Sequence, residues 1–183
     1  MNQEPQNAVP FENSYWAVDG TLLAGQYPTD DEFGEATIPM LEGLLEVGVR
    51  HFINLTEEEE TSIRGDYRNV IERIAAARNL QVSFSHFSIP DRRVPSVKWM
   101  EFILDDIDNF LWSDSGAVYV HCWAGRGRTG TVVGCFFARH GVAVGEEALK
   151  LISSLRSAAS LLRIESPETE EQREFVRQWK LDQ

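Results

Sequence analysis

One short stretch, residues 121–130 (HCWAGRGRTG), gathers a nucleophile, a fixed positive charge and a glycine-rich loop. Cys122 offers a thiol that attacks only when ionised, and nearby cations or a helix N-terminus lower the pKa of such thiols from about 8.5 to roughly 3.5–7.5. Arg128, six residues later, offers a planar guanidinium that matches two phosphate oxygens. Gly125 and Gly127 let backbone N–H groups close around an anion. The stretch therefore predicts phosphoester chemistry.

The pattern H-C-x-x-G-x-x-R-T-G in this stretch resembles the signature of the cysteine-dependent protein-tyrosine and dual-specificity phosphatase superfamily. The resemblance implies that Cys122 attacks phosphorus and that the Thr129 hydroxyl stabilises the thiolate when it leaves. It also implies that His121 supports the loop or the thiolate, with a packed strand histidine as an equal alternative. Trp123 is expected either to form one side of the pocket or to cover the core. The residues expected to bind the phosphate are Trp123, Ala124, Gly125, Arg126, Gly127 and Arg128.

A second loop must supply a carboxylic acid, because the oxygen that leaves phosphorus needs a proton. Asp91 is the candidate, since it lies 31 residues before Cys122 in a loop, residues 89–95, that contains two prolines and two arginines. This placement resembles the mobile general-acid loop of the superfamily. An ordinary turn aspartate is the alternative for Asp91, and Asp114 in a later turn is the weaker rival for the acid.

Near the C-terminus, residues 168–175 (ETEEQREF) are similar to the superfamily segment in which glutamine positions the hydrolytic water. Glu168 stands at the first of the two glutamine positions, and only the second is matched, by Gln172. A water-positioning role for Gln172 is therefore one hypothesis. An exposed helix face is the favoured alternative.

The net charge of −12 over 183 residues argues against nucleic acid or an anionic membrane as a partner, because both are polyanions. Positive charge at residues 121–130 must therefore capture the substrate, and Arg126 adds to it. Much of the acidity comes from Glu57–Glu60, which is expected to be a solvated loop without a function.

The cysteine and histidine content predicts no metal and no other cofactor, because two cysteines and four scattered histidines fit neither a disulfide framework nor a zinc site. Cys135 lies in an apolar stretch and is expected to fill the core rather than to form a redox pair with Cys122. Residues 1–10 lack the pattern of a signal peptide, and no apolar run is long enough to cross a bilayer. We expect a soluble, intracellular, cytoplasmic protein whose oligomeric state stays open.

Strand and helix patterns alternate along the chain, which predicts an α/β fold with a central, mostly parallel sheet flanked by helices. Strand patterns cover a hairpin at residues 15–24 and runs at residues 51–55, 82–87 and 117–120. Helix patterns cover residues 39–47, 67–74, 97–111 after a Ser96 cap, 129–140, 146–157, and 167–179 with Ser166 as cap and Pro167 first. The three aspartates at residues 105, 106 and 108 are expected to be mostly solvated. Residues 1–10 are expected to form a loose tail and residues 11–183 one catalytic domain.

Together with the resemblance, these patterns predict a phosphatase that works through a cysteinyl-phosphate intermediate. The dual-specificity-like branch fits best, because residues 57–66 show no phosphotyrosine-recognition segment and the chain is shorter than the tyrosine-specific members. We expect phosphotyrosine in proteins as the substrate, with phosphoserine and phosphothreonine as further candidates. The alternatives are a phosphoinositide or inositol-phosphate phosphatase, a non-catalytic phosphate-binding module, and sulfur or arsenate chemistry.

Overall fold

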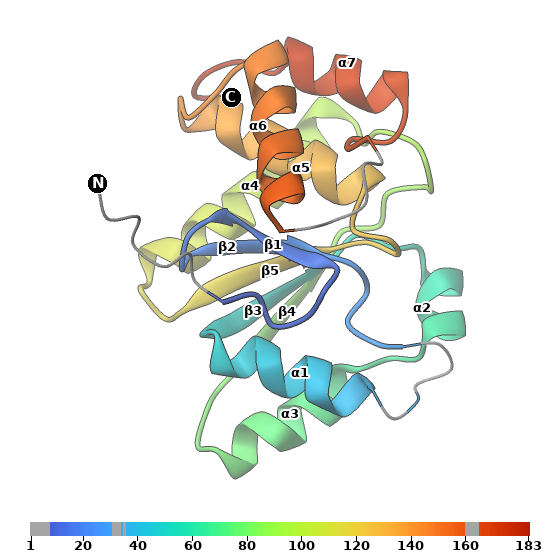
Figure 1. Ribbon diagram of the computed structural model, residues 1–183, viewed down its shortest axis with the longest axis vertical. Coiled ribbons are helices and arrows are strands. Elements are labelled where there is room, and N and C mark those ends of the chain that lie inside the picture. The colour runs from blue at the N-terminus through green and yellow to red at the C-terminus, as the bar shows by residue number, and fades with distance from the viewer. Residues whose placement is uncertain (1–7, 31–33, 35, 160–164) are drawn as a thin grey trace.

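The computed structural model describes residues 8–30, 34, 36–159 and 165–183 of the chain. At its centre lies a five-stranded sheet in the order β1-β2-β5-β3-β4 (Figure 1). Its strands are β1 (Ser14–Val18), β2 (Leu22–Gly25), β3 (Val49–Asn54), β4 (Ser83–His86) and β5 (Ala117–His121). Strands β1 and β2 pair antiparallel as the predicted hairpin, and the other neighbouring pairs are parallel. The α/β fold with a mostly parallel sheet is confirmed.

Helices cover both faces of the sheet. They are α1 (Thr37–Glu46), α2 (Glu58–Arg64), α3 (Arg68–Ala77), α4 (Val97–Trp112), α5 (Gly127–Arg139), α6 (Glu146–Ala158) and α7 (Glu170–Gln178). Figure 1 shows α1 and α3 on one face, α4 to α7 on the other, and α2 beside the end of the sheet. This arrangement leaves the loops at one end of the strands free to form a site.

Strand β5 lies in the middle of the sheet, and all five of its residues are buried. Ala117 and Tyr119 belong to the core beneath α1 and α3, whereas Val118 and Val120 belong to the core beneath α4 to α7. This alternation follows from side chains pointing to opposite faces of a strand. A strand packed on both faces holds the residue that follows it, Cys122, in a fixed place.

The start of α7 differs from the prediction. Ser166 and Pro167 were expected to open the helix, but it begins at Glu170 with Thr169 as its N-cap. Thr169 Oγ1 accepts a hydrogen bond from the Gln172 backbone N–H at 3.2 Å, and the Gln172 side chain accepts one from the Thr169 N–H at 3.1 Å. This reciprocal capping box satisfies two free N–H groups at once, which a serine cap alone does not do.

The acidic run Glu57–Glu60 is not the solvated loop that the charge pattern predicted. Glu57 is the N-cap of α2, and Glu60 completes a capping box by accepting the Glu57 backbone N–H at 2.8 Å. The glutamate three residues after the cap fits the usual capping-box pattern, but Glu57 stands where serine or threonine ordinarily marks the cap, and the density of charge obscured the rest of the signal. Other predicted elements occur with ends shifted by a few residues; α5, for example, begins at Gly127.

The aspartates of α4 are also less solvated than expected. Asp108 is 9% exposed and accepts a hydrogen bond from Arg139 at 3.0 Å, while its other oxygen lies 2.9 Å from His140 Nε2. Asp106 pairs with the buried His51 of β3 at 2.8 Å. These pairs tie α4 to α5 and to the sheet.

The predicted tail, residues 1–10, lies mostly outside the described residues. Within the described ranges, no helix combines the length and the apolar character needed to cross a membrane. In the same ranges, no group of three or more His, Cys, Asp or Glu side chains could hold a metal ion.

Because α5 and α7 are closely packed, one added methyl group between them should measurably lower the stability of the fold. A Cβ at Gly134 would lie 2.6 and 2.8 Å from the two methyl groups of Val176. Gly134→Ala is therefore expected to lower the free energy of unfolding by about 1–3 kcal/mol, although alanine favours helix by about 1 kcal/mol. Urea unfolding measures the loss. Because Val176→Ala vacates the space, the double variant should lose less than the two single losses added, and strict additivity would contradict the clash.

Candidate functional site

A pocket of about 400 Å³ opens at the carboxyl end of β5. It is lined by Glu57, Glu60, Asp91, Cys122, Trp123, Ala124, Arg126, Gly127, Arg128 and Glu168. The structure thus brings the predicted nucleophile, the predicted phosphate-binding arginine and the predicted acid into one cavity from two separate loops. In parallel α/β sheets ligands bind at this end of the strands.

The remaining predicted site residues are His121, Gly125, Thr129 and Gln172, and none of them is among the lining residues of this pocket. Thr129 lies in the first turn of α5, and its hydroxyl oxygen is buried without a hydrogen-bond partner among the described residues. A hydroxyl in that state can still donate to a thiolate. Asp114, the rival acid, lies in the turn before β5, whereas Cys122 follows that strand.

The loop predicted to bind phosphate, residues 122–128 and here called the phosphate loop, is held by partners outside it that bind its carbonyl groups. The Tyr27 N–H donates to the Trp123 carbonyl at 3.0 Å, and the Ser166 hydroxyl donates to the Arg126 carbonyl at 2.8 Å. In a trans peptide the N–H points opposite to the carbonyl. The N–H groups of the residues that follow, Ala124 and Gly127, therefore point away from these partners, toward the pocket that both residues line.

Gly125 is required by two features of this loop. Its φ is +66°, a conformation that side-chain-bearing residues rarely adopt. A Cβ there would also lie 2.3 Å from the carbonyl carbon of Gly25 at the end of β2. The loop and the N-terminal hairpin thus meet backbone to backbone, a contact that the sequence analysis did not predict.

Arg156 of α6 is a buried loop contact that the sequence analysis missed. It is 8% exposed, and its guanidinium donates to the Gly125 carbonyl at 3.0 Å. The same guanidinium lies 5.6 Å from the ring centre of Tyr15, whose own pKa burial raises to about 12. The only sequence signal was an arginine at a helical position that the apolar pattern places toward the core.

Arg128 is buried, and three groups surround its guanidinium. Glu60 accepts from both terminal nitrogens, at 2.5 and 2.7 Å, and the Ile89 carbonyl accepts at 3.1 Å. Asp91 Oδ1 lies 3.1 Å from Nη2. Burial alone would lower the pKa of Arg128, but the hydrogen bonds and charges of Glu60 raise it above its ordinary value.

Glu60 itself stays ionised in this arrangement. Partial burial raises the pKa of its carboxyl, but the hydrogen bonds from Arg128 and from the Glu57 backbone outweigh burial and hold the pKa below its usual value. Glu57 reaches in another direction, because its carboxylate accepts the backbone N–H of Asp91 at 3.1 Å. The capping box of α2 therefore anchors both the phosphate-loop arginine and the loop of the candidate acid.

His121 is the last residue of β5 and is completely buried. Its Nε2 lies 2.7 Å from the Tyr67 hydroxyl, and its ring stacks on Tyr119 with centroids 5.4 Å apart. Burial lowers the pKa of His121 to about 3, so the imidazole is neutral at physiological pH. The placement supports a structural role beneath the nucleophile.

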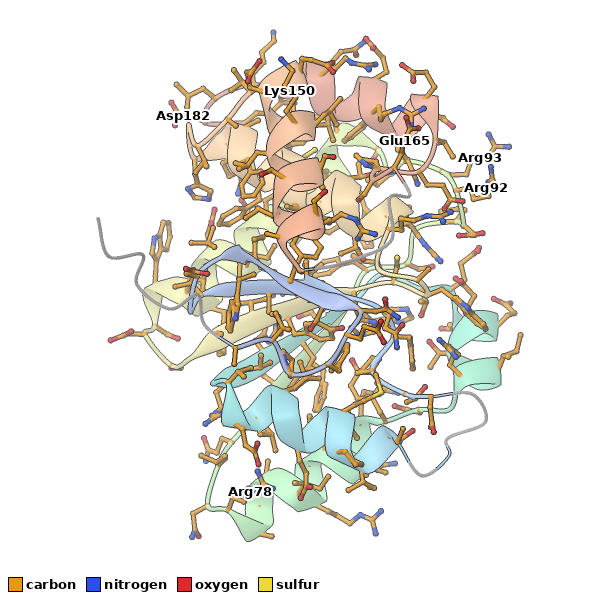
Figure 2. The ribbon with its side chains drawn as sticks, viewed as in Figure 1. Arg78, Arg92, Arg93, Lys150, Glu165 and Asp182 are labelled. Carbon is orange, nitrogen blue, oxygen red and sulfur yellow. The ribbon has the colours of Figure 1, made fainter. Side chains whose placement is uncertain are left out.

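The rim of the pocket pairs opposite charges. Arg126 forms a close ion pair with Glu168, which also lies 3.6 Å from Arg92. Trp123 lies beneath the guanidinium of Arg64 at 4.6 Å from its ring centre. Figure 2 shows Arg92 and Arg93 projecting outward on the side where Glu165 leads toward α7. The positive charge that the sequence assigned to Arg126 is therefore already balanced.

The chain is similar to several known proteins. A family model described as "Swiss Army Knife protein, DSP-PTPase phosphatase domain" (PTP-SAK) matches residues 12–176. Over 114 residues, 62% of the chain, it is 29% identical to PTEN1 of Arabidopsis thaliana, named a phosphatidylinositol 3,4,5-trisphosphate 3-phosphatase and protein-tyrosine-phosphatase. Over 67 residues, 36% of the chain, it is 37% identical to the dual specificity protein phosphatase CDC14B of Mus musculus.

These alignments cover only 26% and 13% of the two relatives' own lengths. Among solved structures, PTPMT1 in complex with PI(5)P superposes with a TM-score of 0.67 at 22% identity, over 91% of this chain and 93% of that one. This last likeness concerns the fold.

The Arg128–Glu60 pair predicts a defined effect of removing one charge. Glu60→Gln leaves the buried guanidinium without its carboxylate, so kcat/KM for an aryl phosphate should fall about tenfold to a hundredfold, corresponding to about 1.5–3 kcal/mol. Steady-state kinetics measure the loss, and thermal unfolding should show a lower midpoint. Glu59→Gln changes an exposed carboxylate of the same helix and is the matched control. Equal effects of the two variants would contradict the anchoring role of Glu60.

Proposed function

The chain belongs to the PTP-SAK family of DSP-PTPase phosphatase domains, and from this membership we propose that it hydrolyses phosphomonoesters through a cysteinyl-phosphate intermediate. It is a cysteine-dependent phosphatase of the dual-specificity and protein-tyrosine phosphatase superfamily. We propose phosphotyrosine in proteins as its first substrate, with phosphoserine and phosphothreonine as further substrates. The observation that carries the proposal is the convergence of Cys122, Arg128 and Asp91 on one pocket.

In the first proposed step, the Cys122 thiolate attacks phosphorus in line with the leaving oxygen. The sulfur–phosphorus bond forms as the phosphorus–oxygen bond breaks, and Asp91 donates a proton to the departing oxygen. Arg128 and the loop N–H groups hold the non-bridging oxygens, whose charge grows in the transition state. The position of Asp91 in the lining of the same pocket as Cys122 and Arg128 supports this division of roles.

In the second step, water attacks the cysteinyl phosphate. Asp91, now ionised, takes a proton from that water, and the Cys122 sulfur leaves as thiolate while inorganic phosphate forms. The Thr129 hydroxyl then donates to the sulfur. Its support is the buried hydroxyl oxygen, which has no hydrogen-bond partner among the described residues and is therefore free to donate.

A phosphoinositide or inositol-phosphate substrate is the second candidate. The names of PTEN1 and of the PTPMT1 complex with PI(5)P favour it. Against it stands the charge of the rim, because Arg126 is paired with Glu168, and the net charge of −12 opposes approach to an anionic bilayer. The pocket lining includes four carboxylate residues beside two arginines, which suits one phosphate group better than several.

Two substitutions test the proposed chemistry. Cys122→Ser should abolish turnover while phosphate binding persists, because the hydroxyl does not ionise but the loop and Arg128 survive.

Asp91→Asn should lower kcat by roughly 10²- to 10⁴-fold for poor leaving groups and far less for acidic ones, since only a basic oxygen needs a proton as it departs. A series of substituted phenyl phosphates measures this dependence. Asp114→Asn is the matched control, and leaving-group dependence in that variant instead would move the acid role there.

Substituting Arg126 at the rim of the pocket tests which class of substrate the protein takes. Because Glu168 already neutralises Arg126, we expect Arg126→Ala to change kcat/KM little, both for phosphotyrosine peptides and for multiply phosphorylated inositols. A phosphate-release panel with both substrate classes measures this. A loss of several-fold to a hundredfold confined to the inositols, the size of one charge-assisted hydrogen bond, would instead favour the second candidate.

A further inference from the structure

The side chain of Gln172 connects α7 to the acid loop, residues 89–95. It is completely buried, so the exposed helix face that the sequence favoured for Gln172 is wrong. Its Oε1 accepts the backbone N–H groups of Glu168 and Thr169, each at 3.1 Å, and its Nε2 donates to the Arg93 carbonyl at 3.1 Å. The amide therefore joins the N-terminal cap of α7 to the backbone two residues after Asp91.

The orientation of this amide is determined by its partners. Two N–H groups meet at the oxygen, so a flipped amide would place its own NH₂ group against two donors. The carbonyl of Arg93 can accept only from the nitrogen side. The hydrogen bond to the loop is thus a consequence of the capping box rather than one of two equal arrangements.

The loop at this point is a strained turn that contains the candidate acid. The Arg93 N–H donates to the Pro90 carbonyl at 3.1 Å, which closes a four-residue turn with Asp91 as its second residue. Arg92, the third residue, has φ of +60°, a conformation that glycine adopts easily and arginine does not. Such a conformation persists only where surrounding contacts enforce it.

On its N-terminal side the loop is held by Glu57, which accepts the Asp91 N–H, and by Arg128, which donates to the Ile89 carbonyl, each at 3.1 Å. On its C-terminal side, few of the contacts that enforce the turn are buried. Arg92 and Arg93 reach Glu168 and Glu171 at 3.6 and 3.5 Å, but both arginine side chains are about two-thirds exposed, and exposed pairs of this kind contribute little. The Thr169 hydroxyl meets the Arg92 carbonyl only at 3.5 Å. The bond from Gln172 is shorter, and the side chain that donates it is completely buried.

We propose that Gln172 is a positioning residue that holds the acid loop closed, so that Asp91 stays in the pocket beside Arg128. The role rests on the proposed function, because it acts through the proton that Asp91 donates. Without the Nε2 bond the turn can relax to an unstrained conformation and carry the Asp91 carboxyl away from the leaving oxygen. This role differs from positioning the hydrolytic water, since it acts through the Asp91 carboxyl, which donates a proton in the first step and accepts one in the second, rather than on the water itself.

Gln172→Glu tests the proposal most directly, because the carboxylate can still accept the two N–H groups of the α7 cap but has no N–H for Arg93. We expect kcat for poor phenyl phosphate leaving groups to fall about tenfold to a hundredfold, with much smaller losses for acidic ones. The acid-dependent limb of the pH profile of kcat should weaken in parallel. Gln172→Leu, which adds no charge, should show the same leaving-group dependence.

Two further variants separate positioning from general destabilisation. Val176→Ala weakens the packing of α7 without touching the acid loop, so it should lower the unfolding midpoint and leave the leaving-group profile unchanged. The double variant Asp91→Asn/Gln172→Glu should be no slower than Asp91→Asn alone, because Gln172 acts only through the Asp91 carboxyl. If the fold-losses of the two single variants multiply in the double variant, the proposal is overturned.

A water-positioning role would give a different kinetic signature. Gln172→Glu would then release a rapid burst of leaving group followed by a slow steady state, with one kcat for every leaving group, because all substrates share the same cysteinyl phosphate. That outcome overturns the positioning role while Cys122→Ser and Asp91→Asn behave as expected. Turnover by Cys122→Ser, or an Asp91→Asn variant indifferent to the leaving group, would overturn the proposed function and this role together.

Discussion

A buried positive charge, the guanidinium of Arg128, is the constraint on which the rest of this structure depends. Removing a charge from water is costly unless it is paired and hydrogen-bonded, and the loss of one partner leaves that cost uncompensated. The partners of Arg128 come from two other segments: the Glu60 carboxylate of α2, and the Ile89 carbonyl and Asp91 carboxylate of the acid loop. Pairing with Arg128 therefore holds the start of α2 beside the pocket and holds the acid loop across it.

The phosphate loop obeys a second constraint, which is that its carbonyl groups are satisfied on the outer side. Tyr27, Arg156 and Ser166 come from the segment after β2, from α6 and from the approach to α7, and each binds a loop carbonyl. Because the peptide unit is rigid, holding the carbonyls outward aims the N–H groups at the pocket before any substrate arrives. Donors arranged in advance need no reorganisation during the reaction, which is the main source of electrostatic catalysis.

The fold could largely be predicted because its signals are local. Apolar runs of strand length and helical spacing indicated the five strands and six of the seven helices, and Ser96 capped α4 as expected, accepting the Trp99 N–H at 3.2 Å. The predictions failed where two local signals competed. Ser166-Pro167 imitated a helix start, but the capping box of Thr169 satisfied more backbone donors three residues later. In Glu57–Glu60, charge density suggested a solvated loop, whereas the same residues cap α2 and bind Arg128.

The sequence by itself determined the fold class and the grouping of Cys122, the glycines and Arg128 in one loop, because residues so close in the chain must also be close in space. It also singled out Asp91 through its position after a strand. Only the tertiary structure decided which polar groups meet: Glu60 with Arg128, Glu168 with Arg126, and the Gln172 amide with the Arg93 carbonyl. The physical reason is that any arginine attracts any carboxylate, so charge type alone does not select a partner. The selection comes from the packing of α2, α7 and the acid loop around one end of the sheet, which brings Glu60 and Glu168 within reach of the two loop arginines.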